Sequence, residues 1–293
     1  MSDRCELLTI IVTFNGIKWI ERCLYSVTHA SVNSDIYIID NGSSDGTIDF
    51  IKENYPEIQL CLSHKNVGFG AANNRGIDYA IKNNYKFVYL LNQDAWIDSN
   101  TFEKLIGVAQ ANPNYGVLSP LQVNGSGKLV DQNFYRCCSR KLLSDALLDE
   151  KIKSVYKTDF VMAAHWLITR ECLKIVGNFS STFPHYGEDN NYVDRIRYHN
   201  LEVGIVPNCI GVHDREERSV TESKNEYLFY VEELVKLSNP NVQYSFFKTL
   251  VRFGMEALKR KRIGYLKYAY KIIIDARKIT VNRIKSQSIG AFY

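Results

Sequence analysis

Carboxylate side chains stand at three places in this sequence where they can bind a metal ion or move a proton. Asp40 follows the apolar run 36–39, and Asp94 comes just after the apolar run 87–91. Glu188 and Asp189 open a helical pattern after an aromatic, glycine-bearing loop. Carboxylates so placed suit a divalent cation bound to phosphate and general-base catalysis.

Asp40 precedes a glycine-rich turn that begins with Asn41, so a carboxylate and several backbone amides share one edge of a predicted sheet. A nucleotide base or ribose is a ligand that such an edge can bind. The alternative is that Asp40 and Asp45 only stabilise a turn and a helix start. The position of Asp40 at the end of a strand favours the first interpretation.

A second glycine-bearing loop spans residues 66–76. It contains Gly68, Phe69 and Gly70, but Asn73 stands where a third glycine would complete a dinucleotide fingerprint. The glycines let backbone approach a ligand closely, and the helix start that follows favours an anionic group. The structural alternative is a tight strand-to-helix turn with Arg75 in a surface ion pair.

Asp94 is the candidate metal ligand. Mn²⁺ or Mg²⁺ bound to a diphosphate needs only one or two protein carboxylates, because phosphate oxygens and water supply the remaining ligands. Helix capping is the alternative, although Asp98 stands closer to the next helix. His213, at the end of an apolar strand pattern, is either a ligand of metal or phosphate or an ordinary structural histidine.

The adjacent pair Glu188 and Asp189 contains the candidate general base. Acidic residues are common in the first turn of a helix because they interact with its dipole, which is the structural alternative. Two carboxylates after the loop 185–187 favour base catalysis, in which an acceptor hydroxyl loses its proton as it attacks. The motif register favours Asp189 as the base.

Apolar strand patterns alternate with helical patterns through the first half of the chain, which predicts a mostly parallel sheet covered by helices on both faces. Ligands of such a sheet bind beyond the carboxyl ends of its strands, where these polar residues stand. Segment 121–157 is predicted to be irregular, with a hairpin turn at 124–127. The predicted strands cover 7–13, 35–40, 58–62, 87–91, 116–120 and 203–206, with 212–213 as the end of the last strand. The predicted helices cover 17–27, 47–54, 70–83, 99–112, 170–176 and the segment after 187.

Positive charge is concentrated near the end of the chain. The net charge is +4, but residues 248–285 carry 12 Lys and Arg against two acidic residues, and the remaining chain carries 24 against 30. The body is therefore unlike a nucleic-acid-binding protein. We expect a catalytic domain over 1–240 and a basic amphipathic helical extension over 241–293, which suits an anionic membrane surface, a solvated face or a homodimer contact.

The seven cysteines are odd in number and scattered, which favours a reducing, cytoplasmic compartment. The apolar run near the N-terminus, residues 7–13, is too short for a signal sequence or a membrane span. We therefore expect a cytoplasmic protein, peripheral on the inner face of the membrane if its basic extension binds lipid.

Five motifs in this order resemble family 2 glycosyltransferases of the GT-A fold, in the branch that contains bacterial rhamnosyltransferases and related cell-surface polysaccharide enzymes. The resemblance spans roughly residues 7–215. It implies an α/β nucleotide-diphospho-sugar transferase fold with a C-terminal helical extension. The motifs are residues 11–15, 40–47, 66–76, 91–94 and 187–195.

The resemblance implies a metal-dependent inverting transfer of a hexosyl or rhamnosyl group from a UDP- or dTDP-sugar to a glycan or lipid-linked glycan. Asp189, with Glu188 beside it, would deprotonate the acceptor, and Asp94 and His213 would hold the metal. Residues implied to bind the nucleotide sugar are Thr13, Asn15, Asp40, Asn41, Gly68, Phe69, Gly70, Asn73, Arg75 and Asn92.

The sequence departs from the family pattern at Gln93, where proline is common, and at His165 and Trp166, which are expected to reshape the sugar pocket. Two alternatives remain. A nucleotidyltransferase would carry a glycine-rich basic loop after the first strand, where this chain has only residues 15–18. A non-catalytic sugar-nucleotide-binding relative would not need both Asp94 and Asp189.

Overall fold

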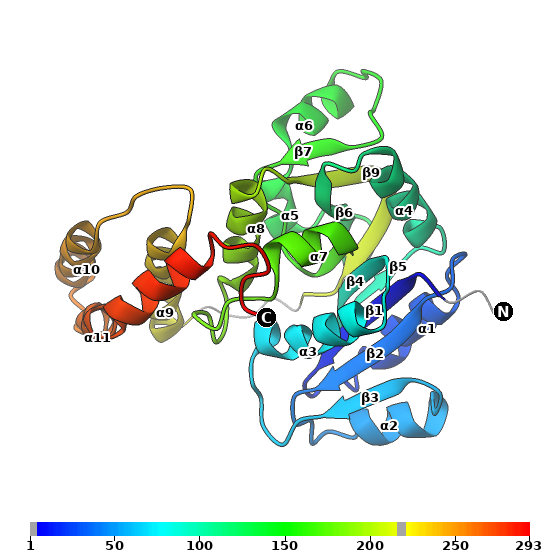
Figure 1. Cartoon of the computed structure of the whole chain (residues 1–293), viewed down its shortest axis with the longest axis horizontal. Coiled ribbons are helices and arrows are strands. Elements are labelled where there is room, and N and C mark those ends of the chain that lie inside the picture. Colours follow the sequence, from blue (N-terminus) through cyan, green and yellow to red (C-terminus); the bar gives the residue numbers. More distant parts are fainter. Residues whose placement is uncertain (1–4, 216–220) are drawn as a thin grey trace.

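A computed structural model describes residues 5–215 and 221–293 (Figure 1). The strands are β1 (Leu7–Thr13), β2 (Asp35–Asp40), β3 (Gln59–Leu62), β4 (Phe87–Asn92), β5 (Ala95–Ile97), β6 (Tyr115–Asn124), β7 (Tyr156–Thr158), β8 (His165–Thr169) and β9 (Glu202–His213). The helices are α1 (Ile20–Thr28), α2 (Thr47–Asn54), α3 (Phe69–Lys82), α4 (Thr101–Ala111), α5 (Gln132–Cys137), α6 (Arg140–Leu147), α7 (Arg170–Val176), α8 (Glu188–Tyr198), α9 (Glu222–Ser238), α10 (Phe246–Arg260) and α11 (Gly264–Lys285).

One mixed sheet organises the fold, with strand order β3-β2-β1-β4-β8-β6-β9-β5 and β7 paired to β9. Strands β3, β2, β1 and β4 are parallel, as the alternating pattern predicted. Strand β8 runs antiparallel to both β4 and β6, and β6 pairs in parallel with β9. The carboxyl ends of β1, β2 and β4 therefore lie at one edge of the sheet, where the candidate residues begin.

Apolar side chains cover both faces of the sheet because successive strand residues point to opposite sides. Leu8 and Ile10 of β1 pack into one core with α3, α7 and α8. Leu7 and Ile11 pack into a second core with α1, α2 and α4. The expected α/β architecture, with helices on both faces and further helices at the C-terminus, is confirmed.

Segment 121–157 is more regular than its sequence suggested. Strand β6 continues to Asn124, and the turn at 124–127 is present, with the amide of Gly127 donating to the carbonyl of Asn124 at 2.8 Å. Helices α5 and α6 and strand β7 follow. Both helices are too short to show a long apolar period in the sequence. The Asp131 carboxylate caps α5 by accepting from the amides of Asn133 and Phe134.

The three C-terminal helices form a lobe beside the sheet domain (Figure 1). Tyr230 and Leu234 of α9 pack with Phe253 of α10 and Ile272 of α11 in one apolar cluster. Residue 240 therefore lies between two helices of the same cluster. The end of the chain returns to the sheet domain, where the carbonyl of Ala291 accepts from the amide of Asn178 at 2.9 Å.

Two further findings concern the chain's environment. None of the seven cysteines, which all fall in the described ranges, forms a disulfide. Over residues 5–215 and 221–293, no helix is long and apolar enough to cross a membrane.

Gly68 sits where two loops touch. Its φ of 89° lies in the region that favours glycine, and a Cβ there would collide with the carbonyl oxygen of Pro184. Pro184 belongs to the loop that precedes α8, so this contact holds the start of α3 against the start of α8. A β-carbon at position 68 would disturb both helix starts.

We expect Gly68→Ala to lower the free energy of unfolding by on the order of 2 kcal/mol, because alanine is strained at this φ and must push Pro184 away. Urea denaturation measures the change. Gly107→Ala in α4 is the matched control, since a Cβ there meets nothing within 4 Å and should be neutral or stabilising. Equal stability of the two variants would contradict the role assigned to Gly68.

Candidate active site

The Asp40 carboxylate organises the loops that follow β1 and β2. It is fully buried. Oδ1 accepts from the hydroxyl of Thr13 at 2.9 Å and from the hydroxyl of Ser43, and Oδ2 accepts from the amides of Gly42 and Ser43. Asn15, at φ 50°, joins the same loops because its Oδ1 accepts from the amide of Ser44 at 2.9 Å. The Asp40 carboxylate therefore shapes this edge of the sheet by binding backbone amides of the loop that follows β2.

Gln93 ties the end of β4 to the loop after β1. Its side-chain oxygen accepts from the amide of Phe14 at 2.8 Å, and its nitrogen donates to the carbonyl of Phe14 at 3.0 Å. A Cβ at Gly16 would collide with this amide. Gln93 thus holds the loop of Asn15 beside Asp94. The sequence showed only that Gln93 stands where proline is common, and it did not reveal this role.

The loop of residues 66–70 reaches the same edge. The Asn41 side chain is buried, and its oxygen accepts from the amide of Val67 at 3.4 Å. A Cβ at Gly70 would lie 3.5 Å from that of Glu188, so α3 and α8 begin side by side. Phe69 packs edge-on to Phe179.

Two predicted nucleotide-sugar-binding residues of the 66–76 motif lie in helix α3, beyond the loop. Asn73 is buried and donates to the carbonyl of Phe69 at 3.0 Å, within its own helix. The Arg75 guanidinium contacts the hydroxyl of Ser63 and lies 3.8 Å from the sulfur of Cys61, near the end of β3. Both residues thus have partners within the chain, and their role in nucleotide-sugar binding stays a prediction.

Asp94 and His213 meet where β4 and β9 end. Asp94 Oδ1 lies 3.3 Å from His213 Nε2, and the amide of Asp214 donates to the carbonyl of Asp94 at 2.8 Å. Burial raises the pKa of Asp94, but the hydrogen bond and charge of His213 outweigh it, so the net shift lowers that pKa. Asp94 is thus kept as an anion.

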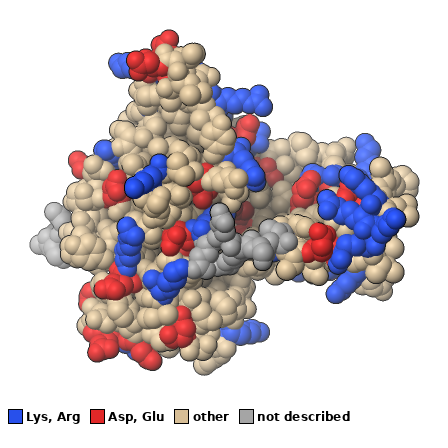
Figure 2. Space-filling view, turned by 180° about the vertical axis from the view of Figure 1, so that it is seen from behind, with Lys and Arg blue, Asp and Glu red and all other residues tan. Residues whose placement is uncertain are grey.

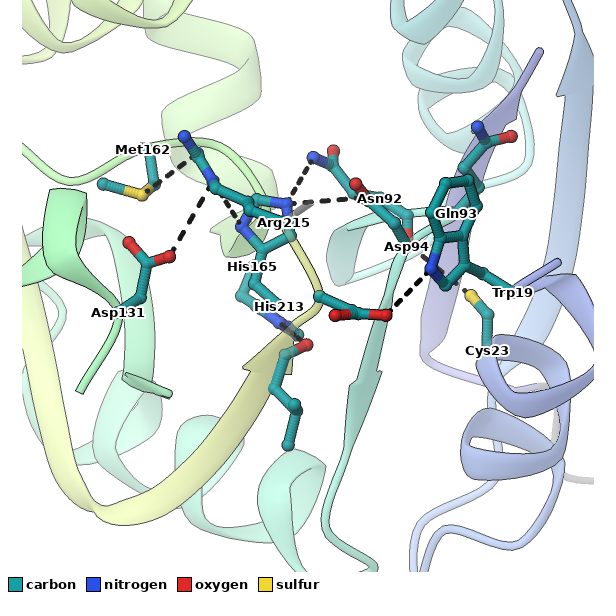
Figure 3. Close-up of polar contacts among 12 residues, drawn as sticks. Trp19, Cys23, Asn92, Gln93, Asp94, Asp131, Met162, His165, His213 and Arg215 are labelled. Atoms are coloured by element: carbon teal, nitrogen blue, oxygen red, sulfur yellow. Dashed lines mark hydrogen bonds and ion pairs between the residues drawn. The ribbon is translucent and has the colours of Figure 1, made fainter. Parts of the chain in front are cut away.

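Arg215 contacts His213 from the other side (Figure 3). Its Nε donates to His213 Nδ1 at 3.1 Å, so a neutral His213 carries its proton on Nε2, facing Asp94. The Asn92 amide nitrogen lies 3.4 Å from the same Nε2, while the buried Asn92 Oδ1 has no partner among the described residues.

His165 and Trp166 lie beneath the site and do not line it. Both are fully buried. His165 Nδ1 lies 2.9 Å from the hydroxyl of Tyr89, and Nε2 lies 3.0 Å from the carbonyl of Val212. Burial, followed by the charge of His213, lowers the pKa of His165 to about 3, so the ring is neutral. The expectation that these two side chains reshape the sugar pocket is wrong, because both are enclosed by the core.

Glu188 and Asp189 begin α8 and differ in surroundings. Glu188 is 6% exposed, and its Oε2 has no partner among the described residues. Burial, followed by the charge of Asp189, raises the pKa of Glu188 to about 8. Burial also raises the pKa of Asp189, but backbone amides of Asn190 and Ala163 and the charge of Arg215 oppose that shift. The net shift of the Asp189 pKa is still upward, but its carboxylate accepts a hydrogen bond, whereas Glu188 Oε2 has no partner among the described residues.

Asp94 and His213 fit a cation whose other ligands come from elsewhere. Over the described ranges, no group of three or more His, Cys, Asp and Glu side chains could hold a metal ion by itself. A carboxylate and an imidazole suit Mn²⁺ when diphosphate oxygens and water complete the shell. Ligation through His213 Nε2 requires its proton to move to Nδ1, so Arg215 must release that atom.

Several residues of this network were missed by sequence reasoning. Arg215 joins the two acidic groups, since its charge lowers the pKa of both Asp94 and Asp189. The indole of Trp19 donates to Asp214 Oδ2 at 2.9 Å across 195 residues of chain. Arg215 stands two positions after His213, and that spacing was the only local signal.

Residues 9–171, more than half of the chain, match the sequence model of the protein family described as glycosyl transferase family 2. The chain belongs to this family. The resemblance drawn from the motifs is therefore confirmed at the level of the family.

Two curated glycosyltransferases are similar to part of this family 2 chain. SunS, the SPbeta prophage-derived glycosyltransferase of Bacillus subtilis, is 28% identical over 109 residues, covering 37% of this chain and 25% of SunS. The N-acetylglucosaminyl-diphospho-decaprenol L-rhamnosyltransferase of Mycobacterium tuberculosis is 29% identical over 124 residues, covering 39% of this chain and 40% of that enzyme. The matches thus span less than half the length of either relative.

Solved structures show the same GT-A fold over nearly the whole chain. TarS 1-349 of S. aureus aligns with a TM-score of 0.59 at 14% identity, covering 96% of this chain and 80% of that one. GalNAc-T7 with UDP, GalNAc and Mn²⁺ also gives a TM-score of 0.59 at 14% identity, covering 95% and 58%. At such identity the likeness establishes the fold of this chain.

The raised pKa of Glu188 predicts a pH-dependent stability. A carboxyl that binds its proton more tightly when folded favours folding at low pH, and this contribution disappears as the pH rises from 4.5 towards about 8. Glu188→Gln removes the effect. Between pH 5 and pH 8, the free energy of unfolding of the variant should therefore rise relative to that of the parent by on the order of a few kcal/mol. Urea denaturation at both pH values measures the difference.

Glu171→Gln is the control, because Glu171 is exposed and also lies in the first turn of a helix. Its difference from the parent should not change over this pH range. A flat difference for Glu188→Gln as well would contradict the buried, protonated Glu188.

Proposed function

We propose that this chain is a metal-dependent inverting glycosyltransferase whose general base is Asp189. The observation that carries the proposal is the joining of Asp94, His213 and Arg215 at one edge of the sheet, with the charge of Arg215 reaching Asp189 as well. In this proposal, the ligands of a diphosphate-bound metal and the general base share one cationic side chain, that of Arg215.

The contrast between the two acids supports Asp189 as the base. Glu188 has a pKa of about 8 and keeps its proton near neutral pH, so it cannot accept another. Asp189 receives the amide of Asn190 at 2.8 Å, which stabilises its anion. Its pKa is nevertheless raised, which brings it closer to the pH at which a base is most effective.

In this mechanism the acceptor oxygen forms a bond to the anomeric carbon as the bond to the diphosphate oxygen breaks. The hydroxyl proton moves to the Asp189 carboxylate, and the nucleoside diphosphate leaves with the electron pair. A bound Mn²⁺ or Mg²⁺ supplies positive charge to the leaving group. Asp94 and His213 would hold that ion. Arg215, which contacts His213, would add its own positive charge beside the leaving group.

We propose a UDP- or dTDP-sugar as donor and a glycan or lipid-linked glycan as acceptor, with a hexosyl or rhamnosyl group transferred. UDP in the TarS and GalNAc-T7 structures and UDP-GlcNAc in a further TarS structure support the donor class. The decaprenol-linked acceptor in the name of the mycobacterial relative supports the acceptor class. The loops of Asn15, Asp40 and Gly68 would frame the nucleotide.

The experiment for the donor site is thermal stabilisation by UDP-, dTDP- and GDP-sugars, each with and without Mn²⁺. A ligand that binds only the folded chain raises its melting temperature. We expect a Mn²⁺-dependent rise for one nucleotide class and its loss in Asp94→Asn, which removes the carboxylate charge at nearly constant size. Asp98→Asn is the control, because Asp98 is exposed and stands four residues away. No shift with any donor would overturn the proposed donor site.

The experiment for the base uses Asp189→Asn with the donor identified above. Turnover, followed as release of nucleoside diphosphate, should fall by roughly 10²–10⁴-fold, the usual contribution of a general base. Donor binding should stay nearly unchanged, because Asp189 acts on the acceptor. Asp194→Asn, one and a half turns further along α8, is the control. Equal turnover in Asp189→Asn and the parent would show that another group removes the proton.

A further inference from the structure

Helix α10 carries apolar residues on two separate faces. Thr249 and Phe253 are fully buried against the rest of the lobe. A second set points outward at spacings of three and four residues, which places its members in one stripe along the helix. These outward residues, between 44% and 81% exposed, are Phe247, Val251, Met255 and Leu258.

Helix α11 repeats this arrangement. Tyr265, Ile272 and Ile279 face inward and are buried. Its outward apolar residues, between 46% and 64% exposed, are Leu266, Tyr270, Ile273, Ile274, Val281 and Ile284. Both helices therefore present to solvent an apolar stripe that no described residue covers.

The two stripes meet at the turn between the helices. An open groove of about 340 Å³ is lined by Gly254, Ala257 and Leu258 of α10 and by Leu266 of α11. Ile263, in the turn itself, also lines the groove and is 82% exposed. We call the two outward stripes with this groove the α10–α11 surface.

Lysines run beside the stripes. On α11, Lys267, Lys271, Lys278 and Lys285 follow the stripe at spacings of four and seven residues. Lys248 and Lys259 do the same on α10. Lys248, Lys267 and Lys278 form no ion pair with the described residues. Figure 2 shows Lys and Arg gathered over this lobe, in contrast to the mixed charges elsewhere on that face.

We propose that the α10–α11 surface docks on an anionic lipid bilayer, a role that goes beyond the proposed sugar transfer and does not depend on it. An amphipathic helix with a basic border lies in the plane of the membrane, where its apolar stripe enters the headgroup boundary. The long lysine side chains then reach the anionic headgroups. The surface thus offers both the apolar and the electrostatic part of interfacial binding.

Charge favours the bilayer over a second copy of this chain. Residues 248–285 contain only Glu256 and Asp275 as acids. Glu256 already pairs with Arg260 at 2.8 Å, so a second copy would set lysine rows against each other without compensating carboxylates. Anionic headgroups compensate the lysines directly.

The test is co-sedimentation of the full chain with vesicles of phosphatidylcholine alone or mixed in equal parts with phosphatidylglycerol. We expect binding to the mixed vesicles and little to the neutral ones, with loss at high salt because charge attraction is screened. The double variant Leu258→Ser with Ile263→Ser should bind at least tenfold more weakly. Its matched control replaces Leu147 and Leu148 by Ser. These two residues lie outside the lobe, and their side chains are 83% and 72% exposed.

A second variant tests the charges separately. Replacing Lys248, Lys267 and Lys278 by Gln should weaken binding by roughly a hundredfold, since each basic residue near an anionic surface contributes about a factor of five. Its matched control replaces Lys52, Lys82 and Lys151, which are exposed on the sheet domain. Thermal unfolding and donor-induced stabilisation should be unchanged in every variant, which separates this proposal from the donor site.

Three results would overturn the proposal. The first is a chain that does not sediment with the mixed vesicles. The second is binding that neither lobe variant weakens relative to its control. The third is a dimer in analytical ultracentrifugation that the Leu258 and Ile263 variant dissociates, because the apolar stripe would then be covered by a second copy.

Discussion

The pairing of β5 with β9 fixes the geometry of the site. Ala95 lies opposite His213, and Trp96 lies opposite Val212. Because this register is set by backbone hydrogen bonds, the residue before Ala95 must lie beside the end of β9, which brings Asp94 to His213. The contact of Asp94 with His213 therefore follows from a strand of three residues. The site depends on that strand more than on any single side chain.

The same edge of the sheet is supported from below by neutral and apolar groups. His165 bonds to Tyr89 and to the carbonyl of Val212, directly under His213. Gly211 allows this arrangement, since a Cβ there would lie 2.8 Å from the His165 ring. Because the supporting imidazole is neutral, it adds no charge beneath Asp94 and Arg215, whereas the Asp131 carboxylate lies 3.9 Å from Arg215 Nε.

The helical lobe supports the other half of the site. A Cβ at Gly187, which precedes α8 at φ 83°, would lie 2.8 Å from Val231 of α9. The hydroxyl of Tyr227 donates to the carbonyl of His185 at 2.6 Å. Helix α9 thus packs on the loop that leads to Glu188 and Asp189, so the lobe and the candidate base belong to one packed unit.

The sequence by itself determined the parallel half of the fold and the kinds of residue at its carboxyl edge. Alternating strand and helix periods, the motifs around Asp40 and Asp94, and the basic end of the chain are local patterns, and local patterns can be read from one sequence. The family followed from the order of those motifs. The same periodicity predicted basic amphipathic helices over 241–293.

Tertiary structure decided everything that depends on contacts between distant segments. Strand β5 and helices α5 and α6 are too short to show a period, and the roles of Gln93, Trp19 and Arg215 rest on partners elsewhere in the chain. Hydrogen-bond partners distinguished Asp189 from Glu188, and burial removed His165 and Trp166 from the pocket. Packing also decided which faces of α10 and α11 are covered, because periodicity defines a face while only a neighbouring element can bury it.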